Sequence, residues 1–115
     1  MDIRLKRAWE PPARGDGARI LVDRVWPRGL KKEALALDLW LKDIAPSTAL
    51  RQWFGHRPER FAEFAERYRG ELAANDAAVA ELAPWLRKGR VTLVYGARDE
   101  AHNQAVVLRD WLRSR

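Results

Sequence analysis

The stretch that decides the fold of this chain is residues 91–103, VTLVYGARDEAHN. Its first five residues, Val91–Tyr95, are almost all apolar, a pattern that predicts a short buried β-strand. Gly96 ends this strand, and Asp99 is placed to cap a helix that we expect over residues 100–113. A buried strand that leads through a short loop into a helix is the repeating unit of α/β proteins.

Three further stretches predict strands of the same sheet. Residues 19–23, RILVD, are short and continuously apolar at their centre, which is typical of a strand inside a parallel sheet. Ile3–Trp9 alternates between the two faces and predicts a first strand near a sheet edge. Leu37–Lys42 also alternates and predicts a third strand in chain order.

Helical patterns separate these strands. The clearest runs from Pro58 to about Asn75, where apolar residues recur every three or four positions behind a proline suited to a first turn. A helical turn is expected at residues 31–36, a helix capped by Ser47 or Thr48 follows, and another helix covers residues 76–86. The pattern predicts one α/β domain over residues 1–115, a single small layered domain with a mostly parallel sheet of about four strands flanked by helices.

This fold class predicts where a binding site lies. In open parallel sheets, ligands collect at the carboxyl ends of the strands. Asp23–Gly29 follows one predicted interior strand, and Tyr95–Asp99 follows the last strand. We therefore expect the two segments to face each other across one cleft.

The composition of the chain indicates the cellular compartment and the kind of binding partner that we expect. The chain has no cysteine, which removes disulfides and thiolate chemistry and is typical of a reducing compartment. No apolar stretch reaches the ~18 residues of a membrane span and no signal-peptide pattern follows Met1, so we expect a cytoplasmic protein without membrane contacts. The net charge of +6, most of it in residues 1–60, favours an anionic partner. The alternative is a soluble surface on which arginines pair with the 16 acidic residues. Nothing in the sequence indicates an oligomeric state.

Residues 22–29, VDRVWPRG, hold the densest cluster of candidate binding groups. Arg24 and Arg28 flank a stiff Trp26-Pro27 corner, and Gly29 then allows the chain to turn. Two guanidiniums on a rigid turn at the end of a buried strand are suited to clamp a phosphate or a carboxylate.

The segment after the last predicted strand offers a second anion site. The expected helix N-terminus presents unpaired N–H groups and a partial positive charge, with Arg98 just before it and His102 in its first turn. The alternative is structural: Asp99 caps the helix, Arg98 is solvated and His102 packs against the loop.

The other histidine and two aspartates are the remaining candidates for chemistry. His56 lies between two expected helices that do not require it; beside arginines it would stay neutral and could accept a proton, although a surface-loop histidine fits equally well. Asp23 and Asp99 could form the acid–base pair of a hydrolase, or be two structural caps. No histidine spacing typical of a metal site occurs, so we expect neither a metal nor a cofactor.

Several common signatures are absent from the chain. It contains no Walker A, dinucleotide-binding or serine-hydrolase motif. The six tryptophans are spread along the chain instead of being interleaved with basic residues on one element, so a stacking platform for single strands has weak support. Trp40 and Trp111 fit core positions, whereas Trp26 and Trp53 are candidate pocket walls.

Four segments together resemble the family called domain of unknown function 488, in its YeaO-like branch. They are LVDRVWPRGL, LDLWLKDIAPST, LRQWFGH and VTLVYGARDEAHNQAVVL, and the resemblance runs almost from end to end. It implies a small cytosolic α/β protein of bacterial type, without an established activity. By position the resemblance points to Asp23, Arg24, Trp26, Pro27, Arg28, Gly29, Trp40, Lys42, Pro46, Ser47, Phe54, His56, Arg67, Tyr68, Glu71, Tyr95, Asp99, His102 and Asn103.

Three positions depart from the family pattern. Arg57 stands where the family usually has aspartate, so an acid beside His56 cannot be assumed. Gly96 replaces a common alanine, and Arg98 replaces a common lysine, which keeps the charge.

We expect from these observations a protein that binds a phosphate-bearing ligand, either a nucleotide or the end of a nucleic acid. Arginines would hold the anion, the histidines would orient it or exchange protons with it, and Tyr95 or Trp26 would stack on a base or sugar. A hydrolytic or glycosidic activity with an aspartate as base is a further hypothesis, and the rival is a non-catalytic binding or regulatory module, including a nucleic-acid accessory protein. The candidate ligand-binding residues are Arg24, Trp26, Arg28, Lys42, Ser47, Tyr95, Arg98 and Asn103, and the candidate catalytic residues are Asp23, His56, Asp99 and His102.

Overall fold

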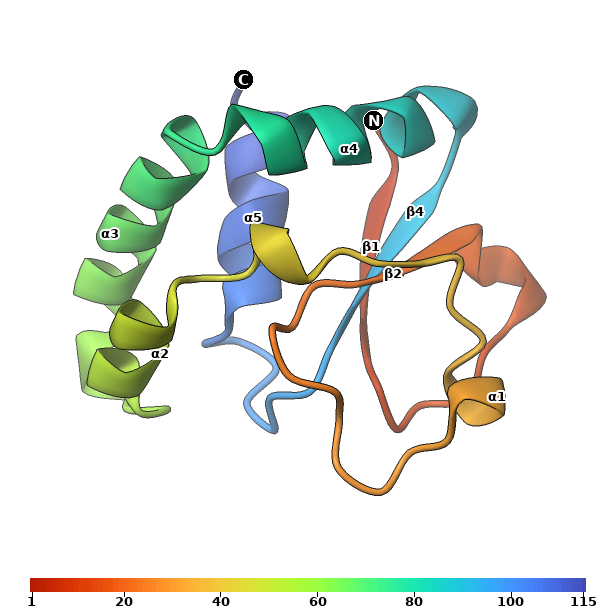
Figure 1. Ribbon diagram of the computed structural model, residues 1–115, viewed down its shortest axis with the longest axis horizontal. Coiled ribbons are helices and arrows are strands. Elements are labelled where there is room, and N and C mark those ends of the chain that lie inside the picture. The colour runs from red at the N-terminus through yellow and green to blue at the C-terminus, as the bar shows by residue number, and fades with distance from the viewer.

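A parallel sheet of four strands organises the structure, a computed structural model that describes residues 1–115 (Figure 1). Across the sheet the strands follow the order β1, β4, β2, β3, and every neighbouring pair is parallel. Their bounds are β1 (Ile3–Arg7), β2 (Ala18–Leu21), β3 (Leu39–Trp40) and β4 (Val91–Tyr95). This architecture confirms the predicted α/β class, with its mostly parallel sheet of about four strands.

The strands occupy the positions that their patterns predict. β1 lies at an edge, while β2 and the fully buried β4 lie inside the sheet. β3 is shorter than predicted, because only Leu39 and Trp40 pair with β2. The chain then turns at once into a 3₁₀ turn over Lys42–Ile44.

Five α-helices accompany the sheet, and a predicted capping residue marks the start of one of them, α2. The Ser47 side chain caps α2 by accepting a hydrogen bond from the Leu50 N–H at 3.2 Å, which decides between Ser47 and Thr48. The helix expected from Pro58 opens with a 3₁₀ turn, Pro58–Arg60, before the α-helix proper. The helices are α1 (Lys32–Leu35), α2 (Thr48–Phe54), α3 (Phe61–Ala73), α4 (Asp76–Lys88) and α5 (Gln104–Arg113).

The last helix, α5, begins at Gln104 instead of residue 100. Its cap is Asn103, whose side chain accepts a hydrogen bond from the Val106 N–H at 3.1 Å. Asp99 instead closes a tight turn in the preceding loop, where its carboxylate accepts from the Ala101 and His102 N–H groups at 2.9 and 3.0 Å. The prediction that Asp99 caps the helix, with His102 in its first turn and Arg98 just before it, is therefore wrong. Both residue types are good caps, so their order in the chain does not identify the one that is used.

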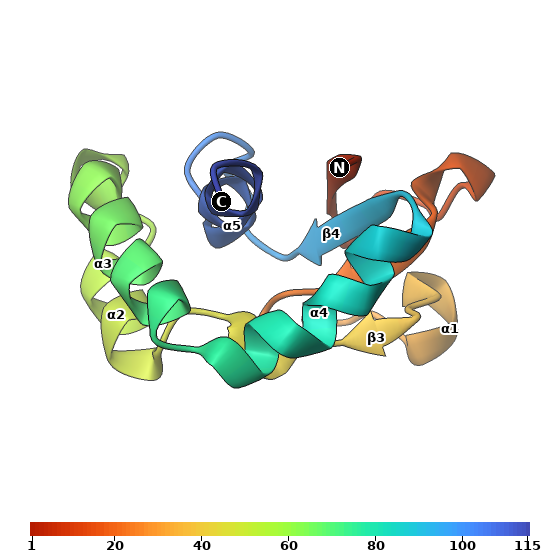
Figure 2. The same cartoon turned by 90° about the horizontal axis from the view of Figure 1, so that it is seen from above.

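The two faces of the sheet are covered to different extents. Ile20, Leu93 and their alternate neighbours point into the main core, which helices α2 to α5 complete. Figure 2 shows α3 beside α5 on the side away from β4, consistent with the contacts of α5 with both α3 and β4. Leu21 and Val94 point to the opposite face and pack with Leu35 of α1 in a much smaller cluster. Loops cover much of that second face.

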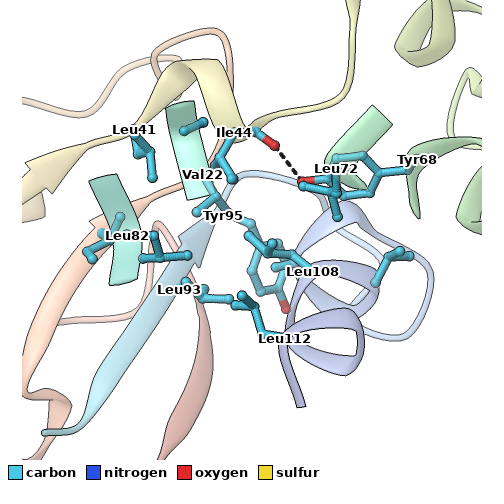
Figure 3. Close-up of a cluster of buried hydrophobic side chains, with 14 of the residues drawn as sticks. Val22, Leu41, Ile44, Tyr68, Leu72, Leu82, Leu93, Tyr95, Leu108 and Leu112 are labelled. Atoms are coloured by element: carbon cyan, nitrogen blue, oxygen red, sulfur yellow. Dashed lines mark hydrogen bonds between the residues drawn. The ribbon is translucent and has the colours of Figure 1, made fainter. Parts of the chain in front are cut away.

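One buried tyrosine ties α3 to the loop before α2. Tyr68 is fully buried, and its hydroxyl donates a hydrogen bond to the Ile44 carbonyl at 2.7 Å (Figure 3). Burial raises the pKa of Tyr68 far above its ordinary value, so the hydroxyl stays protonated and remains a donor. The turn that follows β3 is thereby held close to the carboxyl end of the sheet.

In a buried polar cluster, two basic side chains form ion pairs with one aspartate. Asp16 is paired with Arg19 at 2.7 Å and with Lys6 at 3.1 Å, and Arg19 also donates to the Leu35 carbonyl. These basic side chains stabilise the second face of the sheet and are not available to a partner.

None of the helices has the length and apolar character needed to cross a bilayer.

Candidate functional site

A cavity of about 240 Å³ opens at the carboxyl ends of the strands. Segments that follow all four strands contribute to its wall: Trp9 after β1, Asp23–Arg28 after β2, Pro46 after β3 and parts of residues 96–104 after β4. Helix α2 and the loop behind it complete the wall. The two segments expected to face each other, after β2 and after β4, line the same cavity.

Most of the predicted site residues belong to this wall. Those that line the cavity are Asp23, Arg24, Trp26, Arg28, His56, His102 and Asn103. Those that do not are Lys42, Ser47, Tyr95, Arg98 and Asp99.

Asp23 joins the two halves of the cavity. One carboxylate oxygen, Oδ2, accepts a hydrogen bond from the Gly96 N–H at 2.9 Å, and Oδ1 accepts one from the Gln104 side-chain amide. Burial raises the pKa of Asp23 to about 6, although these two hydrogen bonds and the charge of Arg51 lower it. The carboxyl group can therefore gain or lose a proton near neutral pH, which is uncommon for an aspartate.

Gly96 allows the close approach of Asp23 to the backbone. A Cβ atom at this position would lie 2.7 Å from Asp23 Oδ2, which is shorter than such contacts allow. The alanine that is common in the resembling family would therefore require the carboxylate to shift. At this point the chain differs from the family pattern, and the difference acts directly on the cavity.

His102 is oriented from behind by Asp99. The ring atom Nδ1 lies 2.8 Å from Asp99 Oδ2, and the edge contact with Phe61 has a centroid distance of 5.1 Å. Hydrogen bonds from the Ala101 N–H and from His102 hold the pKa of Asp99 below its ordinary value, so this acid is ionised at neutral pH. Nδ1 then donates to Asp99, which leaves Nε2 as the ring atom able to accept a proton or a hydrogen bond. Asp99 thus acts on His102 and does not itself line the cavity.

The three arginines of the wall differ in what they are free to do. Arg24 donates to the Pro46 and Ala45 carbonyls at 3.2 and 3.0 Å, so it mainly fixes the corner after β2 to the loop before α2. Arg28 is exposed and Arg51 projects from α2, and neither side chain forms a hydrogen bond or an ion pair, although the charge of Arg51 acts on Asp23. Arg51 is a site residue that the sequence reasoning missed, although it stands in the same LRQWFGH segment as His56.

Aromatic rings form the rigid part of the wall. Trp26 donates from Nε1 to the Leu30 carbonyl at 2.7 Å and meets Trp40 edge-on, with the ring centroids 5.3 Å apart. Trp40 in turn donates from Nε1 to the Asp23 carbonyl at 2.7 Å. Phe54 adds an apolar surface, and Trp9, also missed from sequence, completes the wall at the end of β1.

His56 reaches the cavity through an unusual backbone conformation. Gly55 and His56 both have positive φ angles, 55° and 58°, so the chain reverses sharply after α2. A positive φ is uncommon for a residue with a side chain and is often found at functional sites. His56 is exposed at the mouth of the cavity, 6.3 Å from the Phe54 ring between centroids.

Two predicted ligand-binding residues have structural partners elsewhere. The Ser47 N–H and hydroxyl donate to the two carboxylate oxygens of Glu71 at 2.8 and 2.6 Å, besides capping α2. The Lys42 amino group lies 4.5 Å from the Trp40 ring centroid, where it makes a cation–π contact. Both residues hold the loop between β3 and α2 in place behind the cavity.

The other two predicted ligand-binding residues, Tyr95 and Arg98, lie outside the cavity. Tyr95 is 3% exposed and points into the main core (Figure 3), so the expectation that it stacks on a ligand does not agree with its position. Its pKa is raised, chiefly by burial. Arg98 is exposed just outside the rim, beside Arg28. No three histidine, aspartate or glutamate side chains gather closely enough to form a metal site.

Comparisons with known proteins agree with the family resemblance. A family model described as "Inactive DUF488-N3 subclade" matches residues 2–115. The chain is 48% identical over 114 residues to the uncharacterized protein YeaO of Escherichia coli (strain K12), a match that covers 99% of each protein. It is 44% identical over 113 residues to the uncharacterized protein Rv3073c of Mycobacterium tuberculosis (strain ATCC 25618 / H37Rv), which covers 98% of this chain and 95% of that protein. No solved structure matches the chain significantly. With a family model over nearly its whole length and relatives of this identity, the chain belongs to the Inactive DUF488-N3 subclade.

Proposed function

We propose that the cavity binds a small phosphate-bearing ligand of the nucleotide or sugar-phosphate type, and that the protein acts by binding it. The observation that carries this proposal is the mixture of groups in one cavity. Arg28 and Arg51, which form no hydrogen bond or ion pair within the protein, line it beside the carboxylate of Asp23. Guanidiniums hold phosphate through paired, charge-assisted hydrogen bonds. A carboxylate repels phosphate but accepts hydrogen bonds from hydroxyl or amino groups. A ligand with a phosphate at one end and hydroxyl or amino groups at the other can bind to the guanidiniums and to the carboxylate at the same time.

The size of the cavity supports a small ligand. Its volume of about 240 Å³ is slightly below the roughly 300–1,000 Å³ of pockets that enclose drug-sized molecules. A mononucleotide or a sugar phosphate would therefore be partly enclosed, with one end in solvent. The rings of Trp26 and Phe54 supply the apolar surface that a base or sugar needs.

Two observations favour binding over turnover. The subclade to which the chain belongs is described as inactive. Arg57 also stands beside His56 where an acid is usual, so the histidine has no neighbouring carboxylate from that position to orient it. Both features fit a protein that keeps the cleft and its anion-binding groups while lacking a complete catalytic set.

Hydrolysis is a second candidate because of one pair of groups. Asp23 has a pKa of about 6, and His102 is oriented by Asp99 with Nε2 free to accept a proton. Asp23 is suited to general-base chemistry near neutral pH, and His102 presents an oriented ring to the same cavity. Incubation with nucleotides and chromatography of the products distinguishes the two candidates. Binding alone predicts no release of base or phosphate above the uncatalysed rate, and a release that is lost in His102→Gln would favour hydrolysis.

The binding proposal is tested by calorimetric titration and thermal unfolding with nucleoside monophosphates, ribose 5-phosphate and inorganic phosphate. We expect at least one organic phosphate to bind more tightly than inorganic phosphate and to raise the melting temperature. Arg28→Ala and Arg51→Ala should each weaken binding about tenfold or more, since a hydrogen bond to a charged group contributes roughly 1.5–3 kcal/mol.

The matched control is Arg87→Ala, an exposed arginine near the end of α4 that does not line the cavity. Helix α4 lies at the opposite end of the molecule from the loops that follow β1 and β4 (Figure 1). It should bind the ligand like the natural protein. Absence of binding by every phosphate tested, or equal binding by Arg28→Ala and Arg87→Ala, would contradict the proposal.

A further inference from the structure

Beside the cavity lies a second depression of about 410 Å³, lined by Arg7, Trp9, Arg28, Gly96 and Arg98. We call Arg7, Arg28 and Arg98 around Trp9 the arginine shelf. Its residues come from three separate segments: the end of β1, the corner after β2 and the loop after β4. The order β1, β4, β2 across the sheet brings these segments together.

The arginine shelf carries three positive charges that are not held in ion pairs. None of its three arginines forms an ion pair, in contrast to Arg19 with Asp16 and Arg90 with Asp2. Only Arg7 has an internal acceptor, the Ala97 carbonyl at 3.0 Å from its Nε. Three unpaired guanidiniums in one depression favour an anionic partner with more than one charge.

Trp9 adds an exposed aromatic surface to this charge. Its side chain is 45% exposed, one of the few large apolar side chains of the protein that remain so exposed. The Arg7 guanidinium lies 5.2 Å from the ring centroid and makes a cation–π contact with the indole. An exposed indole held among arginines is the combination that binds stacked bases together with their phosphates.

The arginine shelf and the cavity are continuous. Trp9, Arg28 and Gly96 line both, so a ligand can pass from one to the other without leaving the protein surface. A single nucleotide would leave most of the shelf empty. A chain of nucleotides repeats a phosphate and a base at every step and matches a cavity that is followed by charged and aromatic surface.

We infer that the partner is single-stranded nucleic acid, with one nucleotide in the cavity and the adjoining phosphates on the arginine shelf. This inference rests on the proposed function and extends it from a mononucleotide to a strand. A single strand is favoured over a duplex because only unpaired bases expose the faces that Trp9 and the cavity wall can contact.

The experiment measures fluorescence anisotropy of labelled ten-nucleotide single strands, one of DNA and one of RNA, beside calorimetric titration of the matching nucleoside monophosphate. We expect at least one strand to bind no less than tenfold more tightly than the monophosphate. Arg98→Gln should weaken strand binding and reduce its salt slope by about one. It should leave monophosphate binding unchanged, because Arg98 lies outside the cavity.

Two further variants sharpen the result. Trp9→Leu should weaken strand binding at least fivefold, which corresponds to the lower end of base stacking on an aromatic side chain. Arg87→Gln, far from the arginine shelf, should change neither affinity. Melting temperatures of all variants check that the exposed substitutions leave the fold intact.

Each outcome decides the inference separately from the proposed function. Monophosphate binding without tighter strand binding, or strand binding that Arg98→Gln does not weaken, would overturn the inference and leave the proposed function standing. Absence of both kinds of binding would overturn both. Equal affinity for duplex DNA, polyglutamate or anionic vesicles would show a general anion surface and would also overturn the inference.

Discussion

Asp23 shows how one side chain connects the sequence to the site. Its carboxylate bonds to Gly96 and Gln104, and its backbone carbonyl accepts from Trp40, so it links three segments. Its pKa is raised from 3.8 to about 6 because burial disfavours the charged form. The folded protein therefore holds this proton more tightly than the unfolded chain. The related contribution to stability is present below pH 3.8 and is lost as the pH rises through 6, by at most about 3 kcal/mol.

Asp23→Asn should therefore stabilise the protein at high pH. At pH 8 we expect its free energy of unfolding to exceed that of the natural protein by up to about 3 kcal/mol, with the difference vanishing near pH 4. The Gln104 amide can rotate to present its oxygen to the new amide, so the substitution leaves no unpaired group. Urea unfolding at pH 4, 6 and 8 measures the effect. A variant that is less stable than the natural protein at pH 8 would contradict the account.

The sequence predicted which types of residue lie at the strand ends, but not which groups of the protein each of them contacts. The arginines after β2 could be identified as charged groups at a strand end, yet Arg24 is occupied by backbone carbonyls and Arg28 is free. Arg51 is the other cavity arginine without a hydrogen bond, and it comes from a helix whose position over the sheet no local pattern encodes. Which guanidinium is free depends on tertiary contacts.

At the scale of elements, helix starts show the limit of local patterns. Ser47 and Thr48 are adjacent candidate caps, and Asp99 and Asn103 are candidates one helical turn apart. The patterns of apolar residues predicted all four strands at the correct places along the chain, because buried strands require apolar side chains at regular positions. The cap that is used depends on where the preceding loop is fixed, and the Glu71 contact selects Ser47.

Ser47→Ala should therefore destabilise the protein, whereas Thr48→Ala should not. Loss of an N-cap side chain costs about 1 kcal/mol, and the hydroxyl contact with Glu71 adds to this, so we expect roughly 1–2 kcal/mol. Thr48 is exposed in the first turn of α2, and its replacement should change stability by less than about 0.5 kcal/mol. Urea unfolding of the two variants measures this. Equal losses would show that Ser47 is not the effective cap.

At the scale of the whole molecule, the order of the strands creates the site. β4 lies between β1 and β2, so the loops after these strands meet at the carboxyl end of the sheet (Figure 1). The general rule for parallel sheets was sufficient to expect that residues 23–29 and 95–103 lie together. The rule does not give strand order, which is why neither Trp9 nor the arginine shelf could be predicted from the sequence.

The central proposal is that the residues around Asp23–Arg28 and Gly96–Gln104 form a single site for a phosphate-bearing ligand. Titration of isotope-labelled protein with a nucleoside monophosphate, followed through its backbone amide NMR signals, tests this directly. We expect saturable shifts concentrated in those two segments and around Arg51, with α4 unaffected. Shifts confined to other surfaces, or no shifts at millimolar ligand, would contradict it.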